Sequence, residues 1–195
     1  MASNFDIYLA SSSPRRRELL DQIAVTYRVI KQDVPENVLA GESPHDYVQR
    51  LALEKARAGW CAVREQDARP VLGADTTVVI NGRIMGKPLD KEDGLAMLEL
   101  LSDACHQVYS AVALVSGQQE LTRVNCSQVC FRKLTEAEKL AYWNTGEPAD
   151  KAGGYGIQGR AAIFITKLEG SYSGVVGLPL YETAELLREM NLIAL

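Results

Sequence analysis

Residues 7–17 are Ile7-Tyr8-Leu9-Ala10-Ser11-Ser12-Ser13-Pro14-Arg15-Arg16-Arg17, an apolar run followed by a serine-rich turn and three arginines. The apolar run predicts a strand, and Ser13 and Pro14 are typical of the N-cap and first position of a helix. Free backbone N–H groups, the positive end of the helix dipole and several arginines therefore converge on one turn. Such a turn predicts a binding site for a phosphate chain.

The composition is that of a globular protein with one domain. The chain has 195 residues, of which 47% are hydrophobic, which is enough for a well-buried core. Lys and Arg number 21 against 25 Asp and Glu, giving a net charge of -4. This balance disfavours proteins that wrap nucleic acid or coat an acidic membrane, so the three arginines are a local feature.

Features that the sequence lacks indicate the cellular compartment and the state of the cysteines. It has no apolar leader segment at its start and no apolar run long enough to span a bilayer, which predicts a cytoplasmic protein without a membrane partner. The four cysteines do not have the Cys-x-x-Cys spacing of zinc or redox sites. They are Cys61, Cys105, Cys126 and Cys130. In a reducing compartment we expect all four to be reduced thiols used in packing.

Strand-like and helix-like segments alternate along the chain, which predicts a mixed sheet with flanking helices. Asn81-Gly82 predicts a hairpin turn, and Ser43-Pro44 predicts a capped helix start. Further strands are predicted at 27–30, 71–80, 83–85, 106–116, 121–131 and 161–168. Further helices are predicted at 44–60, 91–101, 135–144 and 178–190.

Asp75 interrupts the apolar strand 71–80. A buried carboxylate is costly unless a cation or several donors neutralise it, so we expect a metal ion or a lysine nearby. The alternative is an aspartate at a strand end that accepts backbone hydrogen bonds.

Three further charged residues are candidates for the same site as Asp75. Lys55 shares a helix face with Val48 and Leu51, and its ammonium group reaches either a phosphate or a neighbouring acid. Lys87 follows the hairpin and could enter the same cleft as Asp75, although alone it would be an ordinary loop lysine. Glu36 lies in a polar loop, where it is either solvated or a second ligand for a hard ion such as Mg²⁺.

Two glycine-rich segments resemble nucleotide-binding loops without being them. Residues 154–159 match G-x-G-x-x-G but lead into a predicted strand, whereas a dinucleotide fingerprint leads into a helix. Residues 82–87 are too short for a Walker A loop. The segment 151–159 is either a functional loop that presents Gln158 to a ligand or a structural turn.

Taken together, these segments resemble the Maf family of nucleotide pyrophosphatases, house-cleaning enzymes first associated with septum formation. The resemblance covers nearly the whole chain. It rests on Leu9-Ala10-Ser11-Ser12-Ser13-Pro14-Arg15-Arg16, Glu54-Lys55-Ala56, Gly73-Ala74-Asp75-Thr76, Gly86-Lys87-Pro88, the segment 151–159 and Val176-Gly177-Leu178-Pro179. It implies a single domain over 1–195, with an elongated α/β fold similar to the inosine triphosphate pyrophosphatases, a mixed sheet, a central cleft between two lobes, and a homodimer.

The resemblance also implies site roles and a reaction. Asp75 matches the proton acceptor, Lys55 and Lys87 the cleft lysines, and Glu36 an acidic loop position. The phosphate-contacting residues fall on Ser11, Arg15 and Arg16. The implied reaction converts a nucleoside triphosphate to the monophosphate and pyrophosphate, with Mg²⁺ or Mn²⁺ held by Asp75 and Glu36.

Three positions that differ between subgroups of the family are Arg15, Thr76 and Gln158 here, a combination similar to the dTTP/UTP branch. A glutamine amide can donate to O4 and accept from N3–H of uracil or thymine. The same amide, flipped, could face cytosine, so CTP and modified uridine triphosphates stay among the candidates.

The sequence disfavours two other classes of function. A nucleotide-binding regulator of cell division that does not cut its ligand is disfavoured by the presence of Asp75, Lys55 and Lys87. A minor-groove DNA contact through Ser13-Pro14-Arg15-Arg16 is disfavoured by the net charge of -4.

Overall fold

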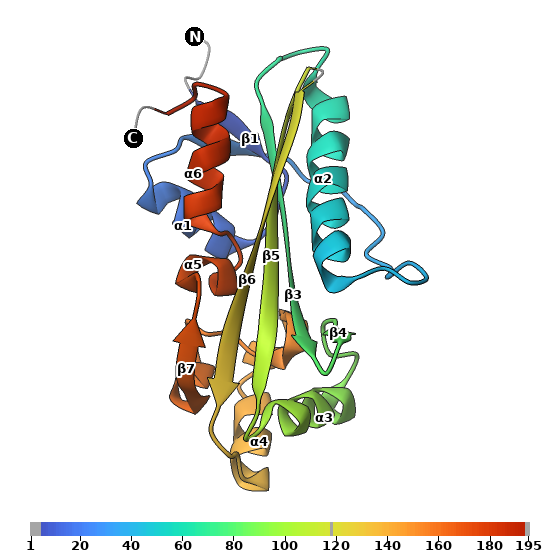
Figure 1. The fold of residues 1–195 in the computed structure, drawn as a ribbon, viewed down its shortest axis with the longest axis vertical. Coiled ribbons are helices and arrows are strands. Elements are labelled where there is room, and N and C mark those ends of the chain that lie inside the picture. The colour runs from blue at the N-terminus through green and yellow to red at the C-terminus, as the bar shows by residue number, and fades with distance from the viewer. Residues whose placement is uncertain (1–4, 118, 194–195) are drawn as a thin grey trace. The chain divides into compact units, whose positions relative to one another are not determined.

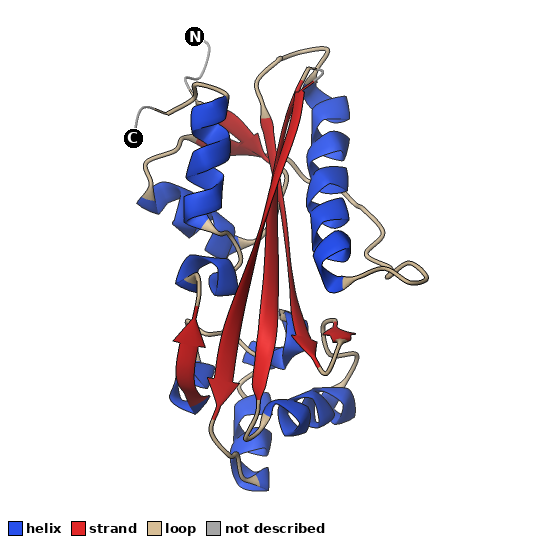
Figure 2. Ribbon diagram, viewed as in Figure 1, coloured by secondary structure: helices blue, strands red, loops and turns tan. Residues whose placement is uncertain are grey.

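The computed structural model describes residues 5–117 and 119–193, in which strands and helices alternate (Figures 1 and 2). The strands are β1 (Ile7–Leu9), β2 (Tyr27–Val29), β3 (Val71–Ile80), β4 (Arg83–Met85), β5 (Cys105–Ser116), β6 (Gln119–Phe131) and β7 (Ile165–Glu169). The α-helices are α1 (Pro14–Gln22), α2 (Pro44–Val63), α3 (Lys91–Leu101), α4 (Glu136–Trp143), α5 (Tyr172–Val176) and α6 (Leu180–Glu189). Three short 3-10 helices occupy Glu147–Asp150, Ala152–Gly154 and Arg160–Phe164.

The strands form one seven-stranded sheet in the order β2-β1-β3-β5-β6-β7, with β4 paired to β3. Strand β1 pairs in parallel with β2 and β3, whereas β4 is antiparallel to β3 and β7 is antiparallel to β6. The prediction of a mixed sheet with flanking helices is therefore confirmed.

The chain divides into two compact units. The first comprises the residues up to Asp75, those from Ser110 to Asn125 and those from Gly177 onward, and the second comprises the rest. A core cluster of the first unit gathers Phe5, Tyr8, Ala10 and Val71. The core of the second unit includes Val78, Leu98, Leu101, Phe131 and Phe164.

Helix α2 lies close to the sheet because small residues face each other at the contact. A Cβ atom on Gly73 would lie 2.3 Å from the carbonyl oxygen of Ala52 and 2.6 Å from the nitrogen of Ala56. A Cβ atom on Gly59 would likewise lie 2.8 Å from a methyl carbon of Val71. Glycine at these two positions therefore sets the distance between α2 and β3.

The C-terminal third differs in part from the sequence-based prediction. Residues 161–164, predicted as strand, lie in a 3-10 helix, and β7 begins only at Ile165. Ala161 and Phe164 are buried while Ala162 and Ile163 are exposed, which is the three-residue spacing of a 3-10 helix. A short apolar run does not distinguish this pattern from a strand. Helix α5 was not predicted.

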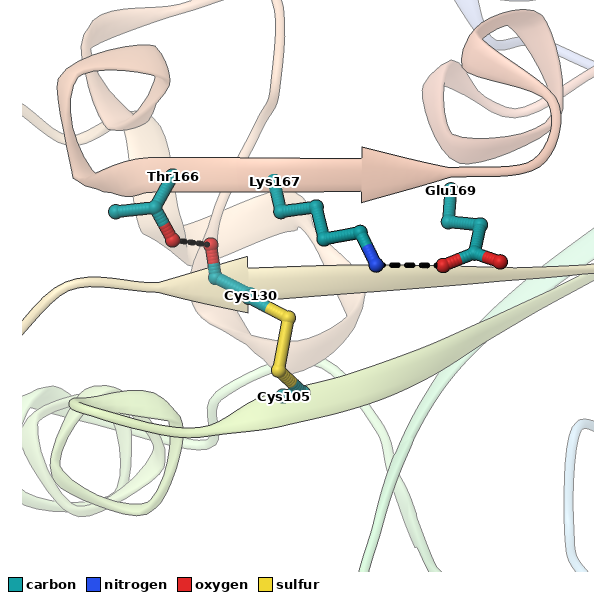
Figure 3. Close-up of a disulfide and its surroundings, with 5 residues drawn as sticks. All are labelled: Cys105, Cys130, Thr166, Lys167 and Glu169. Atoms are coloured by element: carbon teal, nitrogen blue, oxygen red, sulfur yellow. Dashed lines mark hydrogen bonds and ion pairs between the residues drawn. A yellow bond between two sulfur atoms is a disulfide. The ribbon is translucent and has the colours of Figure 1, made fainter.

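The expectation of four reduced packing thiols is wrong for two of them. Cys105 on β5 and Cys130 on β6 form a disulfide with their Cα atoms 4.0 Å apart (Figure 3). The amide of Phe131 donates to the carbonyl of Ala104, so strand register brings the two cysteines together. Spacing in the sequence does not show such a pairing. Cys61 and Cys126 are free, as expected, but exposed rather than packed.

The helices of the described ranges include none that is both long and apolar enough to cross a membrane.

Candidate active site

The arginine-rich turn is built around Ser11, two residues after the end of β1. Its Oγ accepts hydrogen bonds from the amide of Ser13 and from Nη1 of Arg16, each at 3.2 Å. Nε of Arg16 donates to the carbonyl of Gly177 at 2.8 Å. Ser13 and Pro14 occupy the predicted cap and first helical positions, but the side chain of Ser13 makes no capping bond to the described residues. Ser11 instead organises the turn.

Asp75 lies just beyond the parallel part of the sheet. The last β3 residue paired with β1 is Leu72, so Asp75 lies three residues further along β3. Asp75 and Gly73 are two residues apart and therefore lie on the same face of the strand. That face is the one against which α2 packs, so a side chain of α2 can reach Asp75.

The predicted lysine partner of Asp75 is Lys55 of α2. Nζ of Lys55 donates to Oδ1 of Asp75 at 2.7 Å and to Oε1 of Glu36 at 2.5 Å. Asp75 and Lys55 are only 6% and 8% exposed. The expectation of a neighbouring cation is confirmed, and one ammonium group brings the two carboxylates together.

The electrostatics of this cluster are dominated by burial. Burial raises the pKa of Asp75, and the charges of Lys55 and Arg16 oppose that rise without cancelling it. Burial also lowers the pKa of Arg16, an effect opposed by Asp75 and Glu36. A guanidinium stays protonated in proteins, so Arg16 contributes positive charge beside the two acids.

The loop that carries Glu36 is held by two residues that the sequence interpretation missed. The hydroxyl of Tyr47 donates to the carbonyl of Glu36 at 3.0 Å. Arg50 binds both carboxylate oxygens of Glu42, at 2.6 and 2.8 Å, and also donates to the carbonyl of Asn37 at 3.0 Å. Tyr47 precedes Lys55 by eight residues on α2, a spacing that places both on one helix face and could have indicated the contact.

Of the other predicted site residues, Arg15 lies in the arginine-rich turn, and Thr76, Lys87 and Gln158 belong to the second unit. Arg15 is half-buried, and Thr76 follows Asp75 directly on β3. Lys87 and Gln158 are exposed in loops of the second unit. The amide of Gly153 donates to the carbonyl of Gly86 at 3.0 Å, which joins the glycine-rich segment to the loop of Lys87.

The donor set fits a divalent cation shared with phosphate oxygens. In the described ranges, no three His, Cys, Asp or Glu side chains gather as a metal site. Glu36 and Asp75 nevertheless present two carboxylates to one point, where both contact Nζ of Lys55. Mg²⁺ is commonly held by one or two carboxylates together with substrate phosphates, so this pair suits it.

The folded chain is thus an α/β protein. In its first unit, one lysine bridges two carboxylates, and an arginine of the serine-rich turn completes this charged cluster. The chain belongs to the Maf family, described as Maf-like protein, which matches residues 6–190. This confirms the resemblance seen in the sequence motifs.

Individual relatives extend this comparison. A dTTP/UTP pyrophosphatase of Saccharophagus degradans is 55% identical over 93% of this chain and 87% of the relative. A dTTP/UTP pyrophosphatase of Alkalilimnicola ehrlichii is 55% identical over 95% of this chain and 93% of the relative. The solved nucleoside-triphosphatase / dITP/XTP pyrophosphatase of Mycobacterium abscessus has a TM-score of 0.40 and 20% identity, covering 72% of this chain and 94% of that chain.

Proposed function

We propose that this chain hydrolyses dTTP and UTP to the nucleoside monophosphate and pyrophosphate. The observation that carries the proposal is the buried contact of Asp75 with Lys55, in a chain 55% identical to two relatives named dTTP/UTP pyrophosphatase. A carboxylate with a raised pKa is suited to accept a proton from an attacking water molecule. Water then supplies the hydroxyl that cleavage of the phosphoanhydride requires.

The remaining charged residues have roles that follow from their chemistry. Ser11, Arg15 and Arg16 hold the phosphate chain, while Lys55 and Lys87 neutralise negative charge that develops on the pyrophosphate. Each such contact contributes about 3 kcal/mol to lowering the barrier. The proposal takes residues 1–195 as one functional domain, in keeping with the family match over residues 6–190.

The reaction as proposed uses Mg²⁺ or Mn²⁺. Glu36 and Asp75 are the residues that would hold the ion. When bound, it would supply charge neutralisation of the triphosphate and activation of water.

Pyrimidine selection is assigned to Arg15, Thr76 and Gln158. The exposed amide of Gln158 can donate to O4 and accept from N3–H of uracil or thymine. The proposal also includes modified uridine triphosphates as substrates, a homodimer and a cytoplasmic location. A regulator that binds nucleotide without turnover is less well supported, because the relatives carry the name of an enzyme.

A panel of nucleoside triphosphates, assayed for pyrophosphate release with Mg²⁺, tests the proposal. We expect dTTP and UTP to be the preferred substrates and Asp75→Asn to be folded but at least a hundredfold slower. Glu65→Gln, which changes an exposed carboxylate just past α2, serves as the control and should keep full activity. A preference for purine triphosphates, or substantial turnover by Asp75→Asn, would contradict it.

A further inference from the structure

Gln158 lies on a tight turn in the second unit. The amide of Gly159 donates to the carbonyl of Gly156 at 3.0 Å, so Ile157 and Gln158 are the central residues of a four-residue turn. The side chain of Gln158 is exposed. Its position therefore depends on how the two ends of the turn are held.

The backbone on both sides of the turn is linked to the carboxylate of Glu147, directly on one side and through a tyrosine hydroxyl on the other. On one side, the amide of Arg160 donates to Oε2 of Glu147 at 3.0 Å. On the other side, the amide of Gly156 donates to the hydroxyl oxygen of Tyr142 at 3.2 Å. That hydroxyl in turn donates to Oε1 of Glu147 at 2.8 Å. The backbone on either side of Gln158 is thus held by the pair of Glu147 and Tyr142.

The surroundings of Glu147 favour this arrangement. Nζ of Lys151 donates to the backbone carbonyl of Glu147 at 2.6 Å. Tyr142 is 3% exposed, and burial together with the bond to Glu147 raises the pKa of its hydroxyl, which therefore stays protonated as the donor. A Cβ atom on Gly159 would lie 2.1 Å from Oε1 of Glu147. Glycine at position 159 leaves the space that the carboxylate fills.

We propose that Glu147, acting through the turn and with Tyr142, is a positioning residue that sets the position of Gln158 and thereby the selection of the base. This inference rests on the proposed role of Gln158. Uracil and cytosine differ in which amide atom must face position 4 and which must face N3. A turn held at both ends fixes where the side chain of Gln158 begins and so keeps its amide within reach of O4 and N3–H, whereas a loose turn lets the amide move away from them. The phosphate-binding residues are not in this network.

Glu147→Gln tests the inference with little change in size. Tyr142 and the amide of Arg160 bind different oxygens of the carboxylate, and the replacement turns one of these oxygens into an NH2 donor, so one of the two groups loses its acceptor. We expect the ratio of kcat/KM for UTP over CTP to fall about tenfold, mainly through KM for UTP, with kcat for UTP within about twofold. Tyr142→Phe, which keeps the ring, should shift the ratio in the same direction and covers the possibility that Glu147→Gln folds poorly.

Glu138→Gln is the matched control. Glu138 also accepts from a backbone amide and a hydroxyl, those of Thr135, at 2.9 and 3.0 Å, and it lies in the same unit without touching the turn. This variant should keep the UTP-to-CTP ratio. Amide hydrogen exchange of the nucleotide-free protein provides a second readout, and Gly156 and Arg160 should exchange faster in Glu147→Gln but not in Glu138→Gln.

Gln158→Ala separates this inference from the function on which it rests. If Gln158→Ala leaves the UTP-to-CTP ratio unchanged, the role of Gln158 is wrong and the inference falls with it. If Gln158→Ala collapses the ratio while Glu147→Gln and Tyr142→Phe retain it, only the inference is overturned. Loss of selectivity in all three variants, with faster exchange in the Glu147 variant, supports it.

Discussion

Nζ of Lys55 lies 2.7 Å from Oδ1 of Asp75, and the same nitrogen lies 2.5 Å from Oε1 of Glu36. The two acids differ in their access to water, because the side chain of Asp75 is 9% exposed and that of Glu36 is 47% exposed. Lys55 is therefore the main compensation for the charge of Asp75, whereas Glu36 also has solvent. Loss of Lys55 should therefore destabilise the protein through Asp75 more than through Glu36.

Lys55→Met should lower the free energy of unfolding by about 3 kcal/mol, because it leaves Asp75 buried without its cation. Adding Asp75→Asn should recover most of that loss, since the variant then holds no uncompensated charge. Pyrophosphate release should stay at least a hundredfold reduced in both variants. Urea unfolding and a pyrophosphate assay measure the two effects. Equal stability of the single and double variants would show that Lys55 does not stabilise Asp75.

Tyr47→Phe should weaken the response to Mg²⁺ because the hydroxyl of Tyr47 holds the backbone of Glu36. Loss of this hydrogen bond should cost about 1 kcal/mol of stability. The Mg²⁺ concentration for half-maximal rate should rise several-fold, with less change in the rate at saturating Mg²⁺. Tyr181→Phe, at an exposed tyrosine of α6, is the control and should match the wild type. An unchanged Mg²⁺ titration in Tyr47→Phe would exclude this role.

His106 should make stability depend on pH below neutrality. Burial lowers its pKa to about 4, while its Nε2 lies 2.7 Å from the hydroxyl of Tyr155. The unfolded chain binds a proton near pH 6.5, but the folded chain excludes that proton until about pH 4. Stability from this residue is therefore complete above pH 6.5 and is lost as pH falls towards 4, by up to about 3 kcal/mol.

The variants His106→Gln and His45→Gln separate this effect from the titration of carboxylates. Urea unfolding at several pH values from 4.5 to 7.5 should give a shallower dependence for His106→Gln. His45 is exposed, so His45→Gln should follow the wild type. Identical slopes for all three proteins would show that His106 does not titrate as its burial implies.

The disulfide should contribute measurably to stability. Cys105 and Cys130 are 25 residues apart, and a crosslink of that span restricts the unfolded chain by about 3 kcal/mol. The double variant Cys105→Ala/Cys130→Ala should lose that amount relative to the oxidised wild type. Reduction of the wild type with dithiothreitol should remove most of the difference, whereas equal stability before and after reduction would contradict the assignment. The variant Cys61→Ala/Cys126→Ala, which changes the two free thiols, is the control.

Much of the fold followed from local pattern. Strand β3 was predicted with its observed bounds because ten residues of strand-forming character end at the turn Asn81-Gly82. The start of α2 was predicted because Ser43 has the sequence position of an N-cap. The structure confirms this, since the hydroxyl of Ser43 accepts from the amide of Asp46. At Asp75 the apolar strand indicated that a buried carboxylate needs a cation or several donors, and hydrogen bonds from the backbone were the alternative to a cation.

Tertiary structure alone decided which residues meet. The chain contains many lysines, and only the packing of α2 onto β3 at Gly73 selects Lys55 as the partner of Asp75. Register between β5 and β6 paired Cys105 with Cys130, and the fold of the second unit brought Glu147 under the turn of Gln158. Local periodicity determines which residues form an element and which face they occupy. Contacts between remote elements depend instead on how side chains pack together, which no stretch of the sequence specifies by itself.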